Sequence, residues 1–220
     1  MYIIEIEGLD GSGKATQSEM LVRRLKEETS KFVFMKSFPS KNVPSGYFVE
    51  QYLNGNYGEA TELDPKVASL FYALDRYDLS MIMRDYHGDS ILLFDRYVGS
   101  NIIHQTSKGK TLQEKMELAL YIDNLEYGLL KLPRPNVVLF LDMPPTLSSR
   151  LVDSRGRRKD QHETNLDYLE LCYESSLWFC EVFGWKRVPC YKGNTIFSKE
   201  EIHETIYNIV KSDLCGEGMG

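Results

Sequence analysis

The 220-residue chain lacks the features that mark membrane, secreted and nucleic-acid-binding proteins. No apolar run approaches the roughly 20 residues that a transmembrane helix needs, and the N-terminus has neither the basic nor the apolar region of a signal peptide. Positive charge is not in excess, because the formal net charge is −6. We therefore expect no membrane association and no broad affinity for nucleic acid, and a polyanionic ligand would need a local cluster of Arg and Lys.

Cysteine and histidine are scarce, with four of each. The cysteines show neither the spacing of a zinc site nor the density of a disulfide scaffold, and the histidines share no metal-ligand spacing. We therefore expect free thiols in a reducing compartment and interpret the protein as cytoplasmic. The cysteines are Cys172, Cys180, Cys190 and Cys215, and the histidines are His87, His104, His162 and His203.

The remaining composition is ordinary for a globular protein, with 42% hydrophobic and 26% charged residues. At this length we expect a single domain over 1–220. Short apolar runs alternate with helical patterns, which predicts an α/β fold with a parallel sheet covered on both faces. In such sheets ligands gather at the carboxyl ends of the strands. The expected strands are 2–7, 32–35, 91–94, 137–141 and 188–191, and the expected helices are about 15–29, 65–86, 111–131, 145–154, 163–183 and 199–212.

The stretch Gly8–Lys14, with the sequence GLDGSGK, lies between the first expected strand and the first expected helix. Strand, glycine turn and helix is the context in which a G-x-x-x-x-G-K loop binds phosphate. The glycines allow successive backbone N–H groups to point inward, the helix N-terminus adds partial positive charge, and Lys14 can reach the β- and γ-phosphates. A glycine-rich turn without a ligand is the alternative, and the agreement of motif and context favours the phosphate-binding loop.

The residue after Lys14 departs from this motif. Most such loops place Ser or Thr there to bind magnesium. This chain has Ala15, and the hydroxyl comes one place later, at Thr16, about 100° around the helix. We therefore expect magnesium to depend on Asp95, on phosphate oxygens and on retained waters.

The third expected strand ends in Asp95-Arg96-Tyr97. A carboxylate at a strand end beside a phosphate loop can hold magnesium or position the attacking group. Arg96 offers a planar fork of donors that suits a phosphate. A buried Asp–Arg ion pair that only closes the strand is the alternative, and the neighbouring phosphate loop favours the functional interpretation.

Two further segments carry weaker signals. Tyr72 and Arg76 are four residues apart on the helix expected at 65–86, so they share a face that could hold a nucleobase or could be a surface Tyr–Arg contact. The segment 36–41 is typical of an ordinary surface connection. The expected helix also carries an apolar stripe, which we expect in the core: Leu70, Phe71, Leu74 and Tyr77.

Basic residues cluster near the middle of the second half of this acidic protein. A solvated basic loop is the alternative, but a mobile arginine cluster is what phosphoryl transfer uses to neutralise charge on the transferred group. We therefore expect a short arginine-rich lid over about 150–163, made flexible by Gly156. The cluster consists of Arg150, Arg155, Arg157, Arg158 and Lys159.

Taken in order, these segments resemble the thymidylate kinase family over nearly the whole chain. The resemblance implies a three-layer P-loop nucleoside-monophosphate kinase fold, with a five-stranded parallel sheet flanked by helices, usually as a homodimer. It also implies transfer of the γ-phosphate of ATP to dTMP, giving dTDP and ADP for dTTP synthesis, with Mg²⁺ as cofactor. The matching strings are Glu7–Lys14 with Thr16, Phe38-Pro39 followed by Gly46 and Tyr52-Leu53, Leu70–Arg76, Asp95–Asn101 and the segment 150–159.

The resemblance further implies roles for individual residues. Arg96 would grip the dTMP phosphate, Tyr72 would stack on thymine, Arg76 would bond its exocyclic oxygen and Asn101 its ring nitrogen. The implied catalytic residues are Lys14, Asp95, Arg96, Arg155, Arg157 and Arg158, and the implied metal site is Asp95 with Asp10, partly through water. The implied ATP site is Gly8, Asp10, Gly11, Ser12, Gly13, Lys14, Ala15, Thr16 and Arg150. The implied dTMP site is Asp10, Phe38, Pro39, Lys41, Tyr72, Arg76, Arg96, Ser100, Asn101, His104, Gln105 and Tyr173.

Three features depart from the family pattern. Lys41 stands where eukaryotic relatives have an arginine, so a point charge replaces a fork. His104 stands where some relatives have a ring that crowds the sugar 2′ position, and the lid sequence 159–163 is looser than usual. A kinase for another pyrimidine monophosphate therefore remains an alternative, as does a silent nucleotide-binding relative with Ala15. A P-loop switch is a further alternative, although the chain has no Asn-Lys-x-Asp string.

Overall fold

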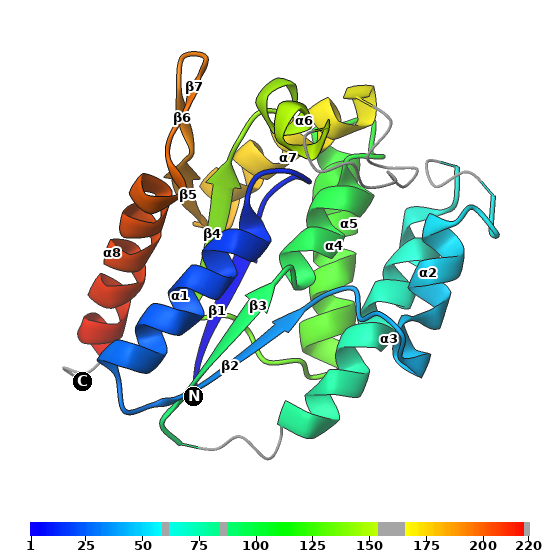
Figure 1. Ribbon diagram of the computed structural model, residues 1–220. Coiled ribbons are helices and arrows are strands. Elements are labelled where there is room, and N and C mark those ends of the chain that lie inside the picture. The colour runs from blue at the N-terminus through cyan, green and yellow to red at the C-terminus, as the bar shows by residue number, and fades with distance from the viewer. Residues whose placement is uncertain (59–61, 84–87, 154–165, 218–220) are drawn as a thin grey trace.

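A five-stranded sheet in the order β2-β3-β1-β4-β5 forms the centre of the protein, which was analysed as a computed structural model. All neighbouring strands in this sheet are parallel, and helices lie on both faces (Figure 1). The predicted three-layer α/β fold is therefore confirmed. The structure describes residues 1–58, 62–83, 88–153 and 166–217. The strands of this sheet are β1 (Tyr2–Glu7), β2 (Phe32–Ser37), β3 (Ser90–Asp95), β4 (Val137–Asp142) and β5 (Lys186–Pro189).

The helices alternate with these strands along the chain. They are α1 (Lys14–Glu28), α2 (Tyr47–Leu53), α3 (Pro65–Met83), α4 (Val98–Thr106), α5 (Leu112–Asp123), α6 (Pro145–Asp153), α7 (Leu166–Val182) and α8 (Lys199–Glu217). A 3-10 turn, η1 (Pro44–Gly46), precedes α2, and a π-helical segment, η2 (Asn124–Leu129), follows α5. A short hairpin of β6 (Tyr191–Lys192) and β7 (Thr195–Ile196) precedes α8.

The alternation of side chains along β1 divides the core between the two faces of the sheet. Tyr2, Ile4 and Ile6 pack with the apolar sides of α1 and α8. Ile3 points to the opposite face, where it packs with residues of α3, α4, α5 and α7. On that second face the next two positions of β1 are Glu5 and Glu7, which are buried carboxyl groups. These carboxyl groups lie at the start of α4, where they accept hydrogen bonds from its backbone.

Two helices were not expected from the sequence, and the termini explain why. The helix α4 has Tyr97 at its N-cap and no side-chain cap of its own. Instead, Glu7 Oε1 accepts from Tyr97 N at 2.8 Å and Glu5 Oε1 accepts from Gly99 N at 2.6 Å. The capping groups come from a strand some ninety residues away, so no local signal marks the helix. The short helix α2 also lacks a side-chain cap.

Other element boundaries differ from the sequence expectation. The helix expected at 111–131 ends as an α-helix at Asp123 and continues as η2. The strand expected at 188–191 is β5, which ends at Pro189, and Tyr191 belongs to the hairpin. Where local capping exists the prediction holds: Thr111 Oγ1 accepts from Glu114 N at 3.1 Å at the start of α5.

The expected core stripe of α3 is wrong for two of its four residues. Leu70 is 39% exposed and Leu74 is 48% exposed, whereas Phe71 and Tyr77 are partly buried. The face of α3 that turns inward is polar as well as apolar and includes Asp75 and Arg76. Leu70 and Leu74 lie on the opposite face of the helix from Asp75 and Arg76. Because only one face of α3 packs on the core, the two leucines are exposed.

All four cysteines are free, as expected, and three of them are buried. Within the described ranges, none of the helices is long and apolar enough to cross a bilayer.

Candidate active site

The predicted phosphate loop lies at the carboxyl end of β1, and the ends of β3 and β4 lie at the same end of the sheet (Figure 1). Gly11 and Gly13 adopt φ values of 82° and 95°, which only glycine takes without strain. The amine of Lys14 folds back over the loop and donates to the carbonyl oxygens of Gly8 and Leu9, each at 2.8 Å. Burial, followed by the charge of Arg96, lowers the pKa of Lys14 to about 8.

Arg96 joins the phosphate loop to helix α4. Its Nη2 donates to Asp10 Oδ1 at 2.5 Å, and its Nη1 donates to Ser100 Oγ at 3.2 Å. Burial raises the pKa of Asp10, but the charges of Arg96 and Lys14 outweigh it and hold that pKa well below its ordinary value. The alternative of an Asp95–Arg96 pair that only closes the strand is not what the structure shows, because Arg96 pairs with Asp10. A guanidinium in this position can meet an anion beside the loop.

The carboxyl pair of β1 supports this arrangement from below. Ser100 Oγ, which accepts from Arg96, donates to Glu7 Oε2 at 2.7 Å. Arg96 itself has φ 68°, in the left-handed region that a side-chain-bearing residue rarely adopts. Burial and the neighbouring Glu7 raise the pKa of Glu5 well above its ordinary value, which favours its protonated form. These two carboxyl groups therefore cap α4 and position Arg96 through Ser100.

Asp95 fits a hard cation such as magnesium. It is buried at the end of β3, and its Oδ2 accepts from Ser37 Oγ at 3.3 Å. Its Oδ1 is buried and has no hydrogen-bond partner among the described residues. An unpaired carboxylate oxygen near phosphate oxygens suits an ion that retains several waters. The described ranges contain no group of three or more His, Cys, Asp or Glu side chains that could hold a metal ion.

The predicted base-binding residues are brought together between α3, α4 and η2. Arg76 is only 1% exposed and forms a bidentate pair with Glu126, at 2.5 Å from Nε and 2.6 Å from Nη2. Asn101 is also buried, and its Nδ2 donates to Glu126 Oε1 at 2.8 Å. The amide of Gln105, one turn along α4, is buried and unpartnered within the described ranges. Tyr72 is partly buried and lies edge-on to Tyr52.

The segment after β2 is not the surface connection that its sequence suggested. Phe38 is buried, and its ring centroid lies 6.0 Å from those of Phe94 and Tyr97. Asp75 of α3 fixes the loop beyond it, since its Oδ2 accepts from Ser40 N at 2.7 Å. Pro39 follows Phe38 through a cis peptide bond, and the neighbouring Lys41 is exposed. The loop is therefore tied to the helix that carries Arg76.

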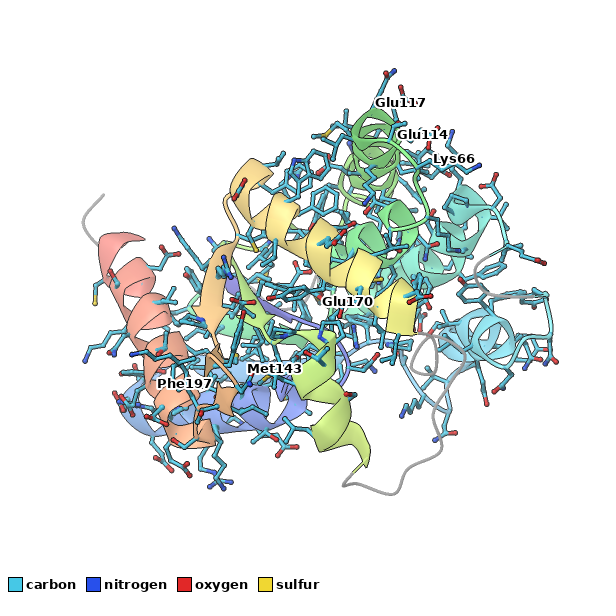
Figure 2. All side chains as sticks on the ribbon, turned by 90° about the horizontal axis from the view of Figure 1, so that it is seen from above. Lys66, Glu114, Glu117, Met143, Glu170 and Phe197 are labelled. Atoms are coloured by element: carbon cyan, nitrogen blue, oxygen red, sulfur yellow. The ribbon has the colours of Figure 1, made fainter. Side chains whose placement is uncertain are left out.

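His104 and two tyrosines of α7 complete the description. His104 Nε2 lies 3.5 Å from Arg96 Nη1, and its Nδ1 lies 3.1 Å from Tyr168 Oη. Tyr173 instead donates to Asp142 Oδ1 at 2.6 Å, at the end of β4. The role expected for Tyr173 stays a prediction, whereas Tyr168 contacts a predicted site residue. In the view onto the strand ends, α7, which carries Glu170, lies beside α6, which begins just after Met143 (Figure 2).

Some predicted residues lie outside the description. Arg155, Arg157, Arg158 and Lys159 fall within 154–165, outside the described residues, and the side chain of Arg150 is likewise not described. Ala15 is exposed and Thr16 is partly buried in the first turn of α1.

Sequence reasoning did not identify Glu126, Asp75, Glu5 or Tyr168 as site residues. Glu126 contacts Arg76 across 50 positions, and Asp75 contacts Ser40 across 35 positions. For Glu126 the one local signal is a glutamate within an apolar helical pattern, and this signal does not predict that Arg76 is its partner.

Comparison with known proteins identifies the family of this chain. The family model for thymidylate kinase matches residues 6–184. A probable thymidylate kinase of Pyrococcus abyssi is 25% identical over 98% of both chains, and the thymidylate kinase of Schizosaccharomyces pombe is 25% identical over 96% of this chain and 91% of its own. The solved thymidylate kinase of Candida albicans, 23% identical, shares the fold with a TM-score of 0.67 over 96% of this chain and 92% of its own. Because the family model covers most of the sequence, the chain belongs to the thymidylate kinase family.

Proposed function

We propose that this chain transfers the γ-phosphoryl group of ATP to dTMP, giving dTDP and ADP. The position of Arg96 carries the proposal, because its guanidinium contacts Asp10 in the phosphate loop and Ser100 on the helix that also bears Asn101. An acceptor phosphate at Arg96 would lie between the ATP phosphates and a base near Arg76 and Asn101. Family membership supports the two substrates.

The chain's own residues account for most of the chemistry. An oxygen of the dTMP phosphate attacks the γ-phosphorus of ATP, and the bond to the β-phosphate oxygen breaks as ADP leaves. Lys14 and the loop N–H groups hold the donor phosphates, and Arg96 neutralises the acceptor phosphate so that the two anions can approach. Arg155, Arg157 and Arg158 of the lid would neutralise charge on the transferred group. Asp95, with Asp10 partly through water, would hold Mg²⁺, which supplies charge neutralisation on the ATP phosphates.

The remaining dTMP contacts follow the predicted roles. Tyr72, Arg76, Asn101 and Gln105 would contact the base, Phe38 with Pro39 and Lys41 would line the phosphate side, and His104 would lie near the sugar. The buried, unpartnered amide atoms of Asn101 and Gln105 support this, because buried polar groups otherwise have partners. Tyr173 retains its proposed position beside the nucleoside.

A homodimer is supported by the outer face of α3. Val67, Leu70, Leu74 and Met81 are exposed apolar residues that recur at helical spacing along this helix. In Figure 1 the helix lies on the side of the molecule away from α8. Exposed apolar stripes are typical of protein–protein contacts, and sedimentation of the purified protein measures whether two copies associate. The four free cysteines support a reducing, cytoplasmic compartment.

A coupled ADP-release assay with ATP and magnesium tests the activity. The acceptors are dTMP, dUMP, UMP and dCMP, and we expect dTMP to give the highest kcat/KM. The Candida albicans enzyme is described as having broad substrate specificity, so the whole panel is needed. An enzyme that binds ATP but releases no more ADP with any acceptor than with buffer would be a silent relative instead.

A further inference from the structure

Glu126 is the buried centre of the base-side cluster. Its carboxylate accepts from Arg76 Nε and Nη2 and from Asn101 Nδ2, at 2.5, 2.6 and 2.8 Å. The side chain is inaccessible to solvent, with an exposed fraction of 0%. A carboxylate can only accept hydrogen bonds, so every group that faces it must present a donor.

This requirement fixes the orientation of the Asn101 amide. Its Nδ2 donates both to Glu126 Oε1 and to the carbonyl oxygen of Ser69, the latter at 3.1 Å. Both amide hydrogens are therefore used by acceptors. A flipped amide would place its oxygen against a carboxylate and a carbonyl, which is repulsive. The hydrogen-bond network, which decides such flips, leaves one solution.

The oxygen of Asn101 is consequently the group left over. Asn101 Oδ1 is buried and has no partner among the described residues. Gln105 lies one turn along α4, on the same face, and both of its amide atoms are also buried and unpartnered there. No described residue bonds the Gln105 amide and fixes its orientation, so this amide can present either a donor or an acceptor. Asn101 differs because Glu126 and Ser69 dictate that it presents an acceptor.

We propose that Glu126 is a positioning residue that sets base selectivity by holding Asn101 with its oxygen toward the nucleobase. The inference rests on the proposed function, in which Asn101 meets the ring nitrogen of the base. Thymine and uracil carry an N–H at position 3 and can donate to this oxygen. Cytosine carries a lone pair at position 3, so two acceptors would face each other. A site with a fixed buried acceptor rejects such a base because neither group finds a donor.

Glu126 also orients Arg76, the second residue proposed to contact the base, so that it favours thymine over cytosine. It takes Nε and Nη2 of Arg76, so Nη1 is the nitrogen outside this bidentate pair. Guanidinium nitrogens are donors only, and therefore suit the 4-carbonyl of thymine and not the 4-amino group of cytosine. One carboxylate thus fixes an acceptor and a donor that together match the edge of thymine or uracil.

The test measures dissociation constants for dTMP, dUMP and dCMP by calorimetry, so that turnover does not enter. Glu126→Met removes one of the two acceptors that hold the Asn101 amide, so the amide can turn its nitrogen toward the base by giving up only its bond to Ser69. We expect the ratio Kd(dCMP)/Kd(dTMP) to fall at least tenfold relative to wild type, while Kd(dUMP)/Kd(dTMP) stays within about threefold, because both of those bases donate from position 3. Glu126→Gln keeps one acceptor oxygen for the Asn101 amide and should retain the wild-type ratio for dCMP.

A second pair of variants guards against failure to fold, since Glu126→Met leaves Arg76 buried without a partner. Arg76→Met is compared with the double variant Arg76→Met, Glu126→Met, in which no unpaired charge remains. The double variant should show at least tenfold less discrimination against dCMP than Arg76→Met alone. Glu117→Gln is the matched control, because Glu117 is exposed on α5 at the edge of the molecule (Figure 2) and should leave all ratios unchanged.

The outcomes separate this inference from the proposed function. If wild-type protein binds dCMP as tightly as dTMP, the proposed function is wrong at its base specificity. If wild type prefers dTMP but removal of Glu126 leaves the dCMP ratio unchanged in both backgrounds, the assignment of Glu126 is overturned. A parallel fall in affinity for all three nucleotides, without a change in their ratios, also overturns it, because that result describes structural support alone.

Discussion

Replacement of Asp75 by alanine should weaken dTMP binding through the loop that follows β2. Asp75 is buried on α3, and its carboxylate accepts from Ser40 N at 2.7 Å and from Ser45 Oγ at 3.1 Å. These bonds fasten residues 40–45 to the helix that carries Tyr72 and Arg76. The turn is closely packed on itself, because a Cβ on Gly46 would lie 1.9 Å from the carbonyl oxygen of Ser40.

The expected loss can be worked from the bonds removed. A hydrogen bond to a charged group contributes about 1.5–3 kcal/mol, and a buried amide left unpaired costs about 1–3 kcal/mol. The bond from Ser40 N is buried, whereas the bond from Ser45 Oγ is partly exposed and water can replace it. Loss of the Ser40 bond alone therefore leads us to expect that the ordered loop loses about 2–3 kcal/mol. If dTMP binds only to the ordered loop, KM for dTMP should rise about 30- to 150-fold.

The assay compares KM for dTMP, KM for ATP and the dissociation constant of thymidine. Because the loop faces the phosphate side of the proposed site, thymidine binding and KM for ATP should change by less than about threefold. Asp75→Asn is the matched control, since its amide oxygen can accept from Ser40 N and its nitrogen can donate to Ser45 Oγ. An equal loss of affinity for dTMP, thymidine and ATP would refute the reasoning and give Asp75 a general structural role.

Three further predictions follow from the site. Because burial lowers the pKa of Lys14 to about 8, kcat/KM for ATP should fall above that pH as the amine loses its proton, and a profile that stays flat to about pH 10 would contradict this. Asp95→Asn should lower kcat steeply and raise the magnesium concentration for half-maximal rate, whereas Ala15→Ser should leave activity intact or lower that concentration; a normal magnesium titration of Asp95→Asn would exclude Asp95 as a ligand. The raised pKa of Glu5 means that the native protein keeps a proton that the unfolded chain releases, so stability falls as pH rises through the ordinary range of Glu. Glu5→Gln should therefore melt increasingly above wild type as pH rises beyond the ordinary range of Glu, and a constant difference in melting temperature would show that Glu5 does not titrate in this way.

The sheet and the phosphate loop were predictable because their signals are local. The apolar run of β1 leads directly into Gly8–Lys14 and then into the helical pattern of α1. One continuous stretch of sequence therefore predicts the first strand, the phosphate loop and the first helix. Arg96, at the end of β3, was predictable as a phosphate-binding residue for the same reason. Its ion pair with Asp10, itself a predicted site residue, was not predictable, because the two residues meet only when β1 and β3 pair in register.

The parts that sequence did not reveal depend on contacts between distant segments. The helix α4 takes its capping groups from Glu5 and Glu7 of β1, and its own first turn contains no capping side chain. The pairing of Arg76 with Glu126 joins α3 to η2 across 50 positions, and no local pattern predicts it. The leucines of α3 were expected in the core, yet the inward face of that helix is taken by Asp75 and Arg76. A buried ion pair overrides the hydrophobic pattern that a helix shows in isolation.

The most direct measurement of the central claim follows the phosphoryl group itself. Purified protein is incubated with dTMP, magnesium and ATP labelled at the γ-phosphate, and the nucleotides are separated. The account predicts that label appears in dTDP in an amount equal to the ADP formed, and that Arg96→Met abolishes both products while ATP still binds. Release of ADP with the label in inorganic phosphate, and none in dTDP, would contradict it.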